Sequence, residues 1–192
     1  MELLEQRILT DGKLLPGGIL KIDSFLNHQM DPVLLQEMAG EVHRLFADAE
    51  VDRVLTIEAS GIALAVLVGL EFRCPVVFAK KSRSSNISHD VYTAEIPSFT
   101  HGNVNTAMVS RDYLHAGERV LLVDDFLATG AALLGLKALV EQAGAKVVGA
   151  VAAVEKRFQG GGDKLRAQGV RVESLARIVK MDDNGIQFGL KS

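Results

Sequence analysis

The segment 120–132 constrains the fold of this chain more than any other part of the sequence. It opens with four apolar residues, which predict a buried parallel strand, and Asp124 and Asp125 follow where that strand should end. The small-residue turn 128–130 then begins a helix that we expect to continue to about Gly144. A turn between a strand and a helix directs free backbone N–H groups and the positive end of the helix dipole toward one spot. The segment therefore predicts an anion site beside two acids, which suits a sugar phosphate.

Each part of this turn suits an anion that approaches the backbone closely. The hydroxyl of Thr129 can cap the helix or bind a phosphate oxygen. The side chains around it are small and leave the backbone accessible: Ala128, Gly130, Ala131 and Ala132. The two acids could hold ribose hydroxyls, either directly or through Mg²⁺. The turn is not a Walker A loop, because no Lys-Ser/Thr pair follows the glycine, and the chain has no Gly-x-Gly-x-x-Gly dinucleotide fingerprint.

Apolar strands alternate with helical patterns along the chain, which predicts an α/β fold with a mainly parallel sheet flanked by helices. Asp31 and Pro32 are a good N-cap and first-turn pair for one helix. The other expected helices are 1–10 and 62–70, and the expected strands are 51–57, 75–79, 104–109, 120–123 and 147–154. Because ligands of such sheets bind beyond the carboxyl ends of the strands, the acids lie where a site is expected.

Two regions depart from this alternation. Residues 80–103 are rich in Ser, Asn, His and Thr, and we expect a long flexible loop whose part 82–103 is mobile without ligand. Residues 1 to about 30, chiefly 16–30, could form a small cap together with the tail after Val170. In that tail, residues 183–185 read Asp-Asn-Gly and predict a hairpin turn. We expect residues 1–192 to form a single domain that includes this cap.

The string of an apolar strand, Asp-Asp, two apolar residues and Ala-Thr-Gly resembles the phosphoribosyl pyrophosphate signature of the type I phosphoribosyltransferases. The whole chain is similar to the xanthine-using branch of that family, including Leu-Leu-Pro-Gly-Gly-Ile-Leu-Lys at 14–21. The resemblance implies transfer of a 5-phosphoribosyl group to xanthine, with Mg²⁺ as cofactor and a homodimer as the assembly. The alternatives are the same transfer to adenine or guanine, or a regulator that binds phosphoribosyl pyrophosphate without catalysis.

The resemblance also implies roles for the residues that hold phosphoribosyl pyrophosphate. Residues 128–132 would bind the 5′-phosphate, and Asp124 and Asp125 would hold the ribose or the metal. Ala59, Ser60 and Gly61 would hold the pyrophosphate, although from the residues alone this is more simply a strand-to-helix turn with Ser60 as N-cap.

The loop 80–103 begins with a cluster of cations, Lys80, Lys81 and Arg83. Alone, this cluster predicts a solvated edge, which is the usual location of a charge run. The resemblance implies instead a lid that closes over the pyrophosphate and shields the reacting ribose from water, with Lys81 as the phosphate contact.

For the purine base, the resemblance implies contacts from Leu20, Asn27 and Lys156. From the residues alone, Leu20 would be a core residue, Asn27 a loop residue, and Lys156 one half of a surface ion pair with Glu155. An ammonium group only donates hydrogen bonds, so Lys156 suits a 6-oxopurine better than adenine.

The chain departs from the hypoxanthine-guanine enzymes at Ala128, where those enzymes carry an acid that helps to handle the purine's proton. The sequence therefore leaves the identity of the general base undecided. The candidates are His89, Asp90 and Glu95 on the long loop. Xanthine is an acidic purine, so it needs little help from a general base to lose its proton.

The net charge, the single cysteine and the residue patterns indicate which partners, redox environment and metal sites to expect. The net charge of −3 gives no general attraction to nucleic acid or to an anionic membrane. Cys74 is the only cysteine, which excludes an internal disulfide and fits a reducing cytoplasm, and packing is its expected role. We find no signal-peptide pattern in residues 1–10 and no ligand spacing among the five histidines, so we expect a cytoplasmic protein without a zinc or iron site.

Overall fold

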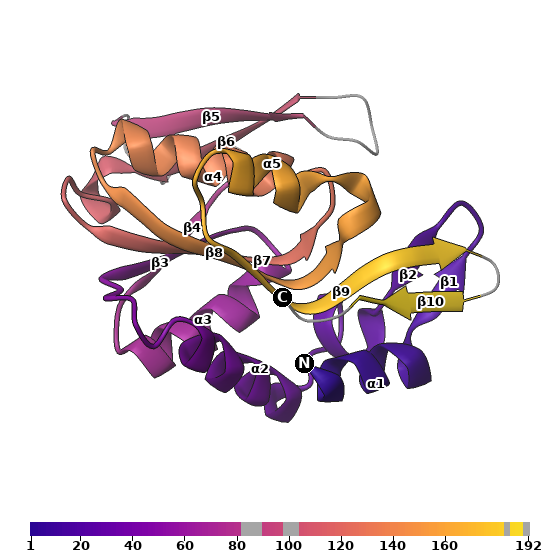
Figure 1. Cartoon of the computed structure of the whole chain (residues 1–192). Coiled ribbons are helices and arrows are strands. Elements are labelled where there is room, and N and C mark those ends of the chain that lie inside the picture. Colours follow the sequence, from indigo (N-terminus) through magenta and orange to yellow (C-terminus); the bar gives the residue numbers. More distant parts are fainter. Residues whose placement is uncertain (82–89, 98–103, 183–184, 190–192) are drawn as a thin grey trace.

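The computed structural model describes residues 1–81, 90–97, 104–182 and 185–189. Within these residues the main sheet has six strands in the order β10-β9-β8-β7-β3-β4 (Figure 1). All neighbouring pairs are parallel except β9 and β10. The strands are β3 (Arg53–Ile57), β4 (Val76–Ala79), β7 (Arg119–Leu127), β8 (Lys146–Lys156), β9 (Val172–Asp182) and β10 (Gly185–Phe188). The predicted α/β fold with a mainly parallel sheet is confirmed.

Helices cover both faces of this sheet, as Figure 1 shows. One face carries α1 (Glu2–Asp11), α2 (Pro32–Leu45) and α3 (Gly61–Phe72), and the other carries α4 (Ala131–Gln142) and α5 (Gly161–Ala167). Alternate residues of β7 serve the two faces: Leu121 packs with the first group of helices and Leu122 with the second. The apolar run at 120–123 is thus apolar throughout because both faces of the strand are buried.

The helix boundaries follow local signals. The Asp31 carboxylate accepts hydrogen bonds from the backbone N–H groups of Val33 and Leu34 at 3.1 and 3.2 Å, which confirms it as the N-cap of α2. The sequence did not predict α5, which is short and begins with glycines. No helix among the described residues is long and apolar enough to cross a membrane.

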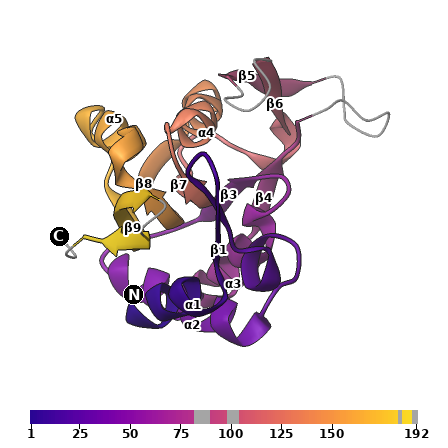
Figure 2. The ribbon, with the colours of Figure 1, turned by 90° about the vertical axis from the view of Figure 1, so that its right-hand side faces the viewer.

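The hairpin of β1 (Lys13–Leu15) and β2 (Ile19–Lys21) is followed by a single π-helical turn, Asp23–Asn27. Figure 2, which looks onto the side of the molecule where this hairpin lies, shows it in front of the main sheet.

The C-terminal tail takes part in two strand pairings. The first part of β9 belongs to the main sheet through its parallel pairing with β8, and its last residues pair with β10. The predicted strands on either side of 183–185 are confirmed as an antiparallel pair, while residues 183–184 lie outside the described residues.

The prediction of one uninterrupted loop at 80–103 is wrong for its middle. β5 (Val91–Pro97) pairs antiparallel with β6 (Val104–Ser110), in a two-stranded sheet separate from the main one. The side chain of Ile96 on β5 packs against α4 at Gly135, where a Cβ would lie 2.5 Å from Ile96 Cγ1. Although the surrounding segment is polar, β5 contains Val91, Tyr92 and Ile96, which have high strand propensity, and pairing with β6 stabilises it. Residues 82–89 and 98–103, including Arg83 and His89, lie outside the described residues.

Candidate active site

Two strand-to-helix loops lie side by side at the carboxyl edge of the sheet, because β3 and β7 are parallel neighbours. The loop after β3 leads into α3, and the loop after β7 leads into α4. At the first residue of α3, Gly61, a Cβ would lie 2.4 Å from Thr56 Oγ1 and 3.4 Å from Asp124 Oδ1. The start of α3 therefore lies against Asp124. Both acids lie within β7, which continues to Leu127, so the expected end of this strand before Asp124 is wrong.

A cavity of about 200 Å³ brings together part of the set of residues that the sequence singled out. The predicted site residues that do not line it are Asp125, Ala59, Ser60, Gly61, Leu20, Asn27 and Lys156. Asp124 and Lys81 both line it, together with the whole turn 128–132. The other lining residues are Ile57, Ile96, Pro97, Asn105, Phe126, Leu127 and Leu133. The tertiary structure thus brings a cation, an acid and an open backbone turn into one space.

The turn after β7 has the conformation that its small residues predict. Gly130 has φ +85°, in the left-handed region that favours glycine, and it is the N-cap residue of α4. Thr129 precedes the N-cap, so its expected role as a helix cap is wrong, whereas its hydroxyl still belongs to a residue that lines the cavity. A Cβ on Gly130 would lie 3.0 Å from the backbone oxygen of Gly161, so this turn packs tightly against the start of α5.

The two acids differ in their surroundings. Asp124 is only 5% exposed and accepts a hydrogen bond at 3.0 Å from the backbone N–H of Asp125. Burial raises the pKa of the Asp124 carboxyl well above its usual value, the neighbouring Asp125 carboxylate raises it further, and Lys81 opposes the shift. Asp125 is half-buried and accepts a 2.6 Å hydrogen bond from Asn27 Nδ2. The link joins the π-helical turn to the carboxyl edge of the sheet.

The loop after β3 is held to the start of the long segment. Glu58 accepts a 2.6 Å hydrogen bond from the backbone N–H of Lys81, which places Lys81 beside this loop. Ala59 is exposed. Ser60 is the N-cap residue of α3, but its side chain makes no capping hydrogen bond to the backbone that the structure describes.

The three residues that we expect to contact the purine base have different surroundings. Leu20 is 6% exposed and packs in the hydrophobic core, which agrees with its interpretation from the residues alone. Asn27 binds Asp125, and its Oδ1 is buried without a hydrogen-bond partner among the described residues. Lys156 is half-buried, its Nζ lies 5.5 Å from the centre of the Phe126 ring, and burial lowers its pKa. Asn27 and Lys156 thus contact two consecutive residues, Asp125 and Phe126.

The predicted surface ion pair between Glu155 and Lys156 is wrong. Glu155 is 1% exposed, and within the described residues its carboxylate contacts Arg166, Arg177 and Ser174. The two neighbours in sequence point to opposite faces of β8, as strand geometry requires.

The two candidates for a general base that the structure describes, Asp90 and Glu95, do not line the cavity that Asp124 lines. Asp90 forms a 2.8 Å ion pair with Arg111. Glu95 lies on the exposed side of β5 and lines a different cavity, of about 590 Å³, between β5 and α4. His89 lies outside the described residues.

Sequence reasoning did not single out three residues of this region. Phe126 lines the cavity, and the ammonium group of Lys156 lies over its ring. The buried hydroxyl of Thr56 lies beside Gly61 and has no hydrogen-bond partner among the described residues. Gly161 supports the turn 128–130 from behind. Only Gly161 had a visible signal, the run of three glycines at 160–162.

The fold and the site together define an α/β protein in which strand-to-helix turns and two acids lie at the carboxyl edge of a parallel sheet, an arrangement that suits anionic ligands. The model of the phosphoribosyl transferase domain matches residues 22–192. Xanthine phosphoribosyltransferases of Bacillus cereus (strain AH187) and Bacillus cytotoxicus are each 48% identical over 188 residues, covering 98% of this chain and 95% of theirs. The chain belongs to the phosphoribosyltransferase family.

Solved structures agree on the fold. Adenine phosphoribosyltransferase from Giardia lamblia, complexed with 9-deazaadenine, superimposes with a TM-score of 0.76 at 24% identity, over 91% of this chain and 97% of that one. The adenine phosphoribosyltransferase of Thermoanaerobacter pseudethanolicus gives 0.74 at 21% identity, over 91% and 99%.

Proposed function

We propose that this protein transfers the 5-phosphoribosyl group of phosphoribosyl pyrophosphate to xanthine, which gives xanthosine monophosphate and pyrophosphate in purine salvage. The observation that carries the proposal is the meeting of Lys81, Asp124 and the turn 128–132 in one cavity, in a chain that is 48% identical to xanthine phosphoribosyltransferases. Its residues would act by positioning and charge stabilisation, without a covalent nucleophile.

The turn 128–132 would hold the 5′-phosphate through backbone N–H groups at the start of α4 and through the Thr129 hydroxyl. The loop 59–61 would receive the pyrophosphate, with Lys81 beside it. Lys81 also opposes the rise in the pKa of Asp124, so cation and acid already influence each other. Such pre-set charges stabilise a developing leaving group without reorganisation during the reaction.

The acids are suited to ribose hydroxyls and to a shared Mg²⁺. No group of three His, Cys, Asp or Glu side chains in the described part of the chain could hold a metal alone. Mg²⁺ commonly uses one or two carboxylates together with water and substrate phosphates, and the Asp124–Asp125 pair fits that pattern. When bound, Mg²⁺ neutralises charge on the pyrophosphate. Asp125, the more exposed of the two, is the better candidate to touch the metal or the ribose directly.

For the base, Lys156 and Asn27 are the polar groups with a physical reason to bind a purine. Lys156 is a donor held over Phe126, and a 6-oxopurine offers it an acceptor. Asn27 Oδ1 is a buried acceptor without a partner among the described residues, and a purine N–H would satisfy it. Leu20 would contribute an apolar contact.

The experiment is a release assay for pyrophosphate with purified protein, phosphoribosyl pyrophosphate, Mg²⁺ and a panel of xanthine, guanine, hypoxanthine and adenine. We expect xanthine to give the highest kcat/KM and adenine the lowest. Preference for adenine would reject the xanthine assignment. Absence of pyrophosphate release with every base, together with measurable binding of phosphoribosyl pyrophosphate, would favour a non-catalytic regulator.

We further propose that residues 1 to about 30 and the C-terminal tail form a cap within a single domain. The hydrogen bond from Asn27 to Asp125 supports this for residues 1–30. We also propose that the protein is a cytoplasmic homodimer, in keeping with its family. Sedimentation velocity should show a species of twice the mass of the 20.7 kDa chain, and a monomer at micromolar concentration would contradict the dimer.

A further inference from the structure

The start of α5 packs against the backbone of the turn that follows β7. The backbone N–H of Gly161 donates a 3.1 Å hydrogen bond to the carbonyl oxygen of Ala128. A Cβ on Gly161 would lie 2.4 Å from that oxygen, 2.4 Å from the backbone nitrogen of Gly130 and 2.6 Å from the carbonyl carbon of Thr129. All three are backbone atoms, which cannot rotate away as a side chain could. The turn therefore keeps its conformation only if residue 161 has no side chain.

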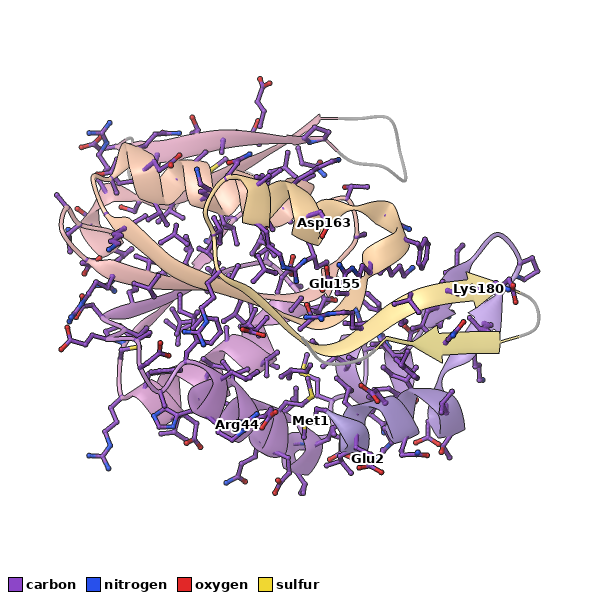
Figure 3. The ribbon with its side chains drawn as sticks, viewed as in Figure 1. Met1, Glu2, Arg44, Glu155, Asp163 and Lys180 are labelled. Atoms are coloured by element: carbon purple, nitrogen blue, oxygen red, sulfur yellow. The ribbon has the colours of Figure 1, made fainter. Side chains whose placement is uncertain are left out.

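A buried carboxylate holds the start of α5 in this place. Glu155 Oε2 accepts a 2.7 Å hydrogen bond from Ser174 Oγ and lies 3.4 Å from Arg177 Nε, both on β9. Arg166 of α5 reaches the same carboxylate, with N–O distances of 3.3 and 3.4 Å. A Cβ on Gly162 would lie 2.0 Å from Glu155 Oε1, so the first turn of α5 rests directly on the carboxylate. Figure 3 shows Glu155 beneath α5, whose Asp163 is labelled above it.

The position of Glu155 in the sheet links it to the same turn from a second direction. Glu155 pairs in the parallel ladder with Leu127, the last residue of β7 before the turn. Glu155 is also followed directly by Lys156, the proposed base contact. Contacts therefore run without a gap from the buried carboxylate, through Gly162 and Gly161, to Ala128 and Gly130.

We propose that Gly161 is a positioning residue of the phosphoribosyl pyrophosphate site, which fixes the backbone of the turn 128–130, and that the buried carboxylate of Glu155 fixes Gly161. The inference rests on the proposed function, because it assigns this contact to the binding of one of the two substrates. Neither residue lines the cavity, so each acts through the turn.

The test compares Gly161→Ala with Gly149→Ala, the same substitution on β8 and away from the cavity. A Cβ on Gly149 would lie 2.2 Å from Phe46 Cε1, so the control variant is also overpacked and should also be destabilised. We expect Gly161→Ala to raise the KM for phosphoribosyl pyrophosphate at least tenfold, while the KM for xanthine changes less than threefold. Ribose 5-phosphate, used as a competitive inhibitor, should lose affinity by a similar factor. Gly149→Ala should keep both constants.

Glu155→Gln tests the second step with a side chain of the same shape and without the charge that Arg166 and Arg177 face. We expect its KM for phosphoribosyl pyrophosphate to rise about three- to tenfold, and a normal KM at a lower unfolding temperature would overturn the role of Glu155. If Gly161→Ala cannot be purified in folded form, the result for Glu155→Gln decides the proposal.

The failure of this inference differs from a failure of the proposed function. A wild-type protein that releases pyrophosphate with xanthine, alongside a folded Gly161→Ala variant with unchanged constants, overturns the inference alone. A wild-type protein without activity on any purine overturns the proposed function.

Discussion

Replacing Gly130 with alanine should separate the conformation of the phosphate turn from the stability of the protein. Gly130 has φ +85°, a conformation that is about 1–2 kcal/mol less favourable for a residue with a Cβ. For a domain of this size, that penalty lowers the unfolding temperature by about 2–8 °C. The new methyl group would also stand 3.0 Å from the backbone oxygen of Gly161, so the turn has a second reason to move.

A shifted turn loses hydrogen bonds to the 5′-phosphate. A hydrogen bond to a charged group contributes about 1.5–3 kcal/mol, so one lost bond should raise the KM for phosphoribosyl pyrophosphate by about one to two orders of magnitude. The assay is initial-rate pyrophosphate release at saturating xanthine, with thermal unfolding followed in parallel by circular dichroism.

Gly117→Ala is the matched control for backbone strain. Gly117 has φ +81° and lies just before the opposite end of β7. Apart from its chain neighbours, no heavy atom of the described residues lies within 4 Å of its Cβ position. It should show a similar loss of stability with a normal KM. The reasoning would be refuted if Gly130→Ala kept the wild-type KM in the folded state, or if Gly117→Ala raised it equally.

Three further predictions concern Asp124, Lys156 and the strand β5. Asp124→Asn should lower kcat/KM by about one to two orders of magnitude, because a charge-assisted hydrogen bond is lost. Its unfolding temperature should exceed that of the wild type by more at pH 7 than at pH 4. The folded-state pKa of Asp124 is raised, so the stability of the wild type falls as the pH rises above the unfolded-state pKa near 3.8, and the variant lacks this loss. Equal differences at both pH values would contradict this reasoning. Lys156→Ala should reduce kcat/KM more with xanthine than with guanine or hypoxanthine. All three bases carry an oxo group at C6, but xanthine loses a proton more readily and the ammonium group favours an anionic base. An equal loss for all bases would reject its role. Amide hydrogen exchange in Val91–Pro97 should be slow without ligand because β5 is paired with β6, and exchange at the rate of an unstructured peptide would contradict that pairing.

Local signals in the sequence were sufficient for most of the sheet and its helices. The apolar runs that became β3, β7 and β8 were recognised because strands buried on both faces have no polar alternation. The start of α2 followed from an Asp-Pro pair whose hydrogen bonds lie within a few residues. β5 was missed because the surrounding segment 80–103 is rich in polar residues, although β5 itself contains the strand formers Val91, Tyr92, Thr93 and Ile96. Pairing with β6 and the packing of Ile96 on α4 stabilise this strand.

The sequence by itself determined the chemistry of the site: two adjacent acids next to a buried apolar run, a small-residue turn and a helix start, all within thirteen consecutive positions whose interactions are local. The structure moved the end of that strand from the expected residue 123 to Leu127, so the acids lie within it. The tertiary structure decided which distant residues serve that turn. Asn27 reaches Asp125 across 98 positions, and Gly161 supports Ala128 from a connection that follows the next strand. It also buried Glu155 and left its neighbour Lys156 half-exposed. The physical reason is that burial and close backbone approach depend on which strands become neighbours, and strand order is set by packing of the whole chain rather than by any local pattern.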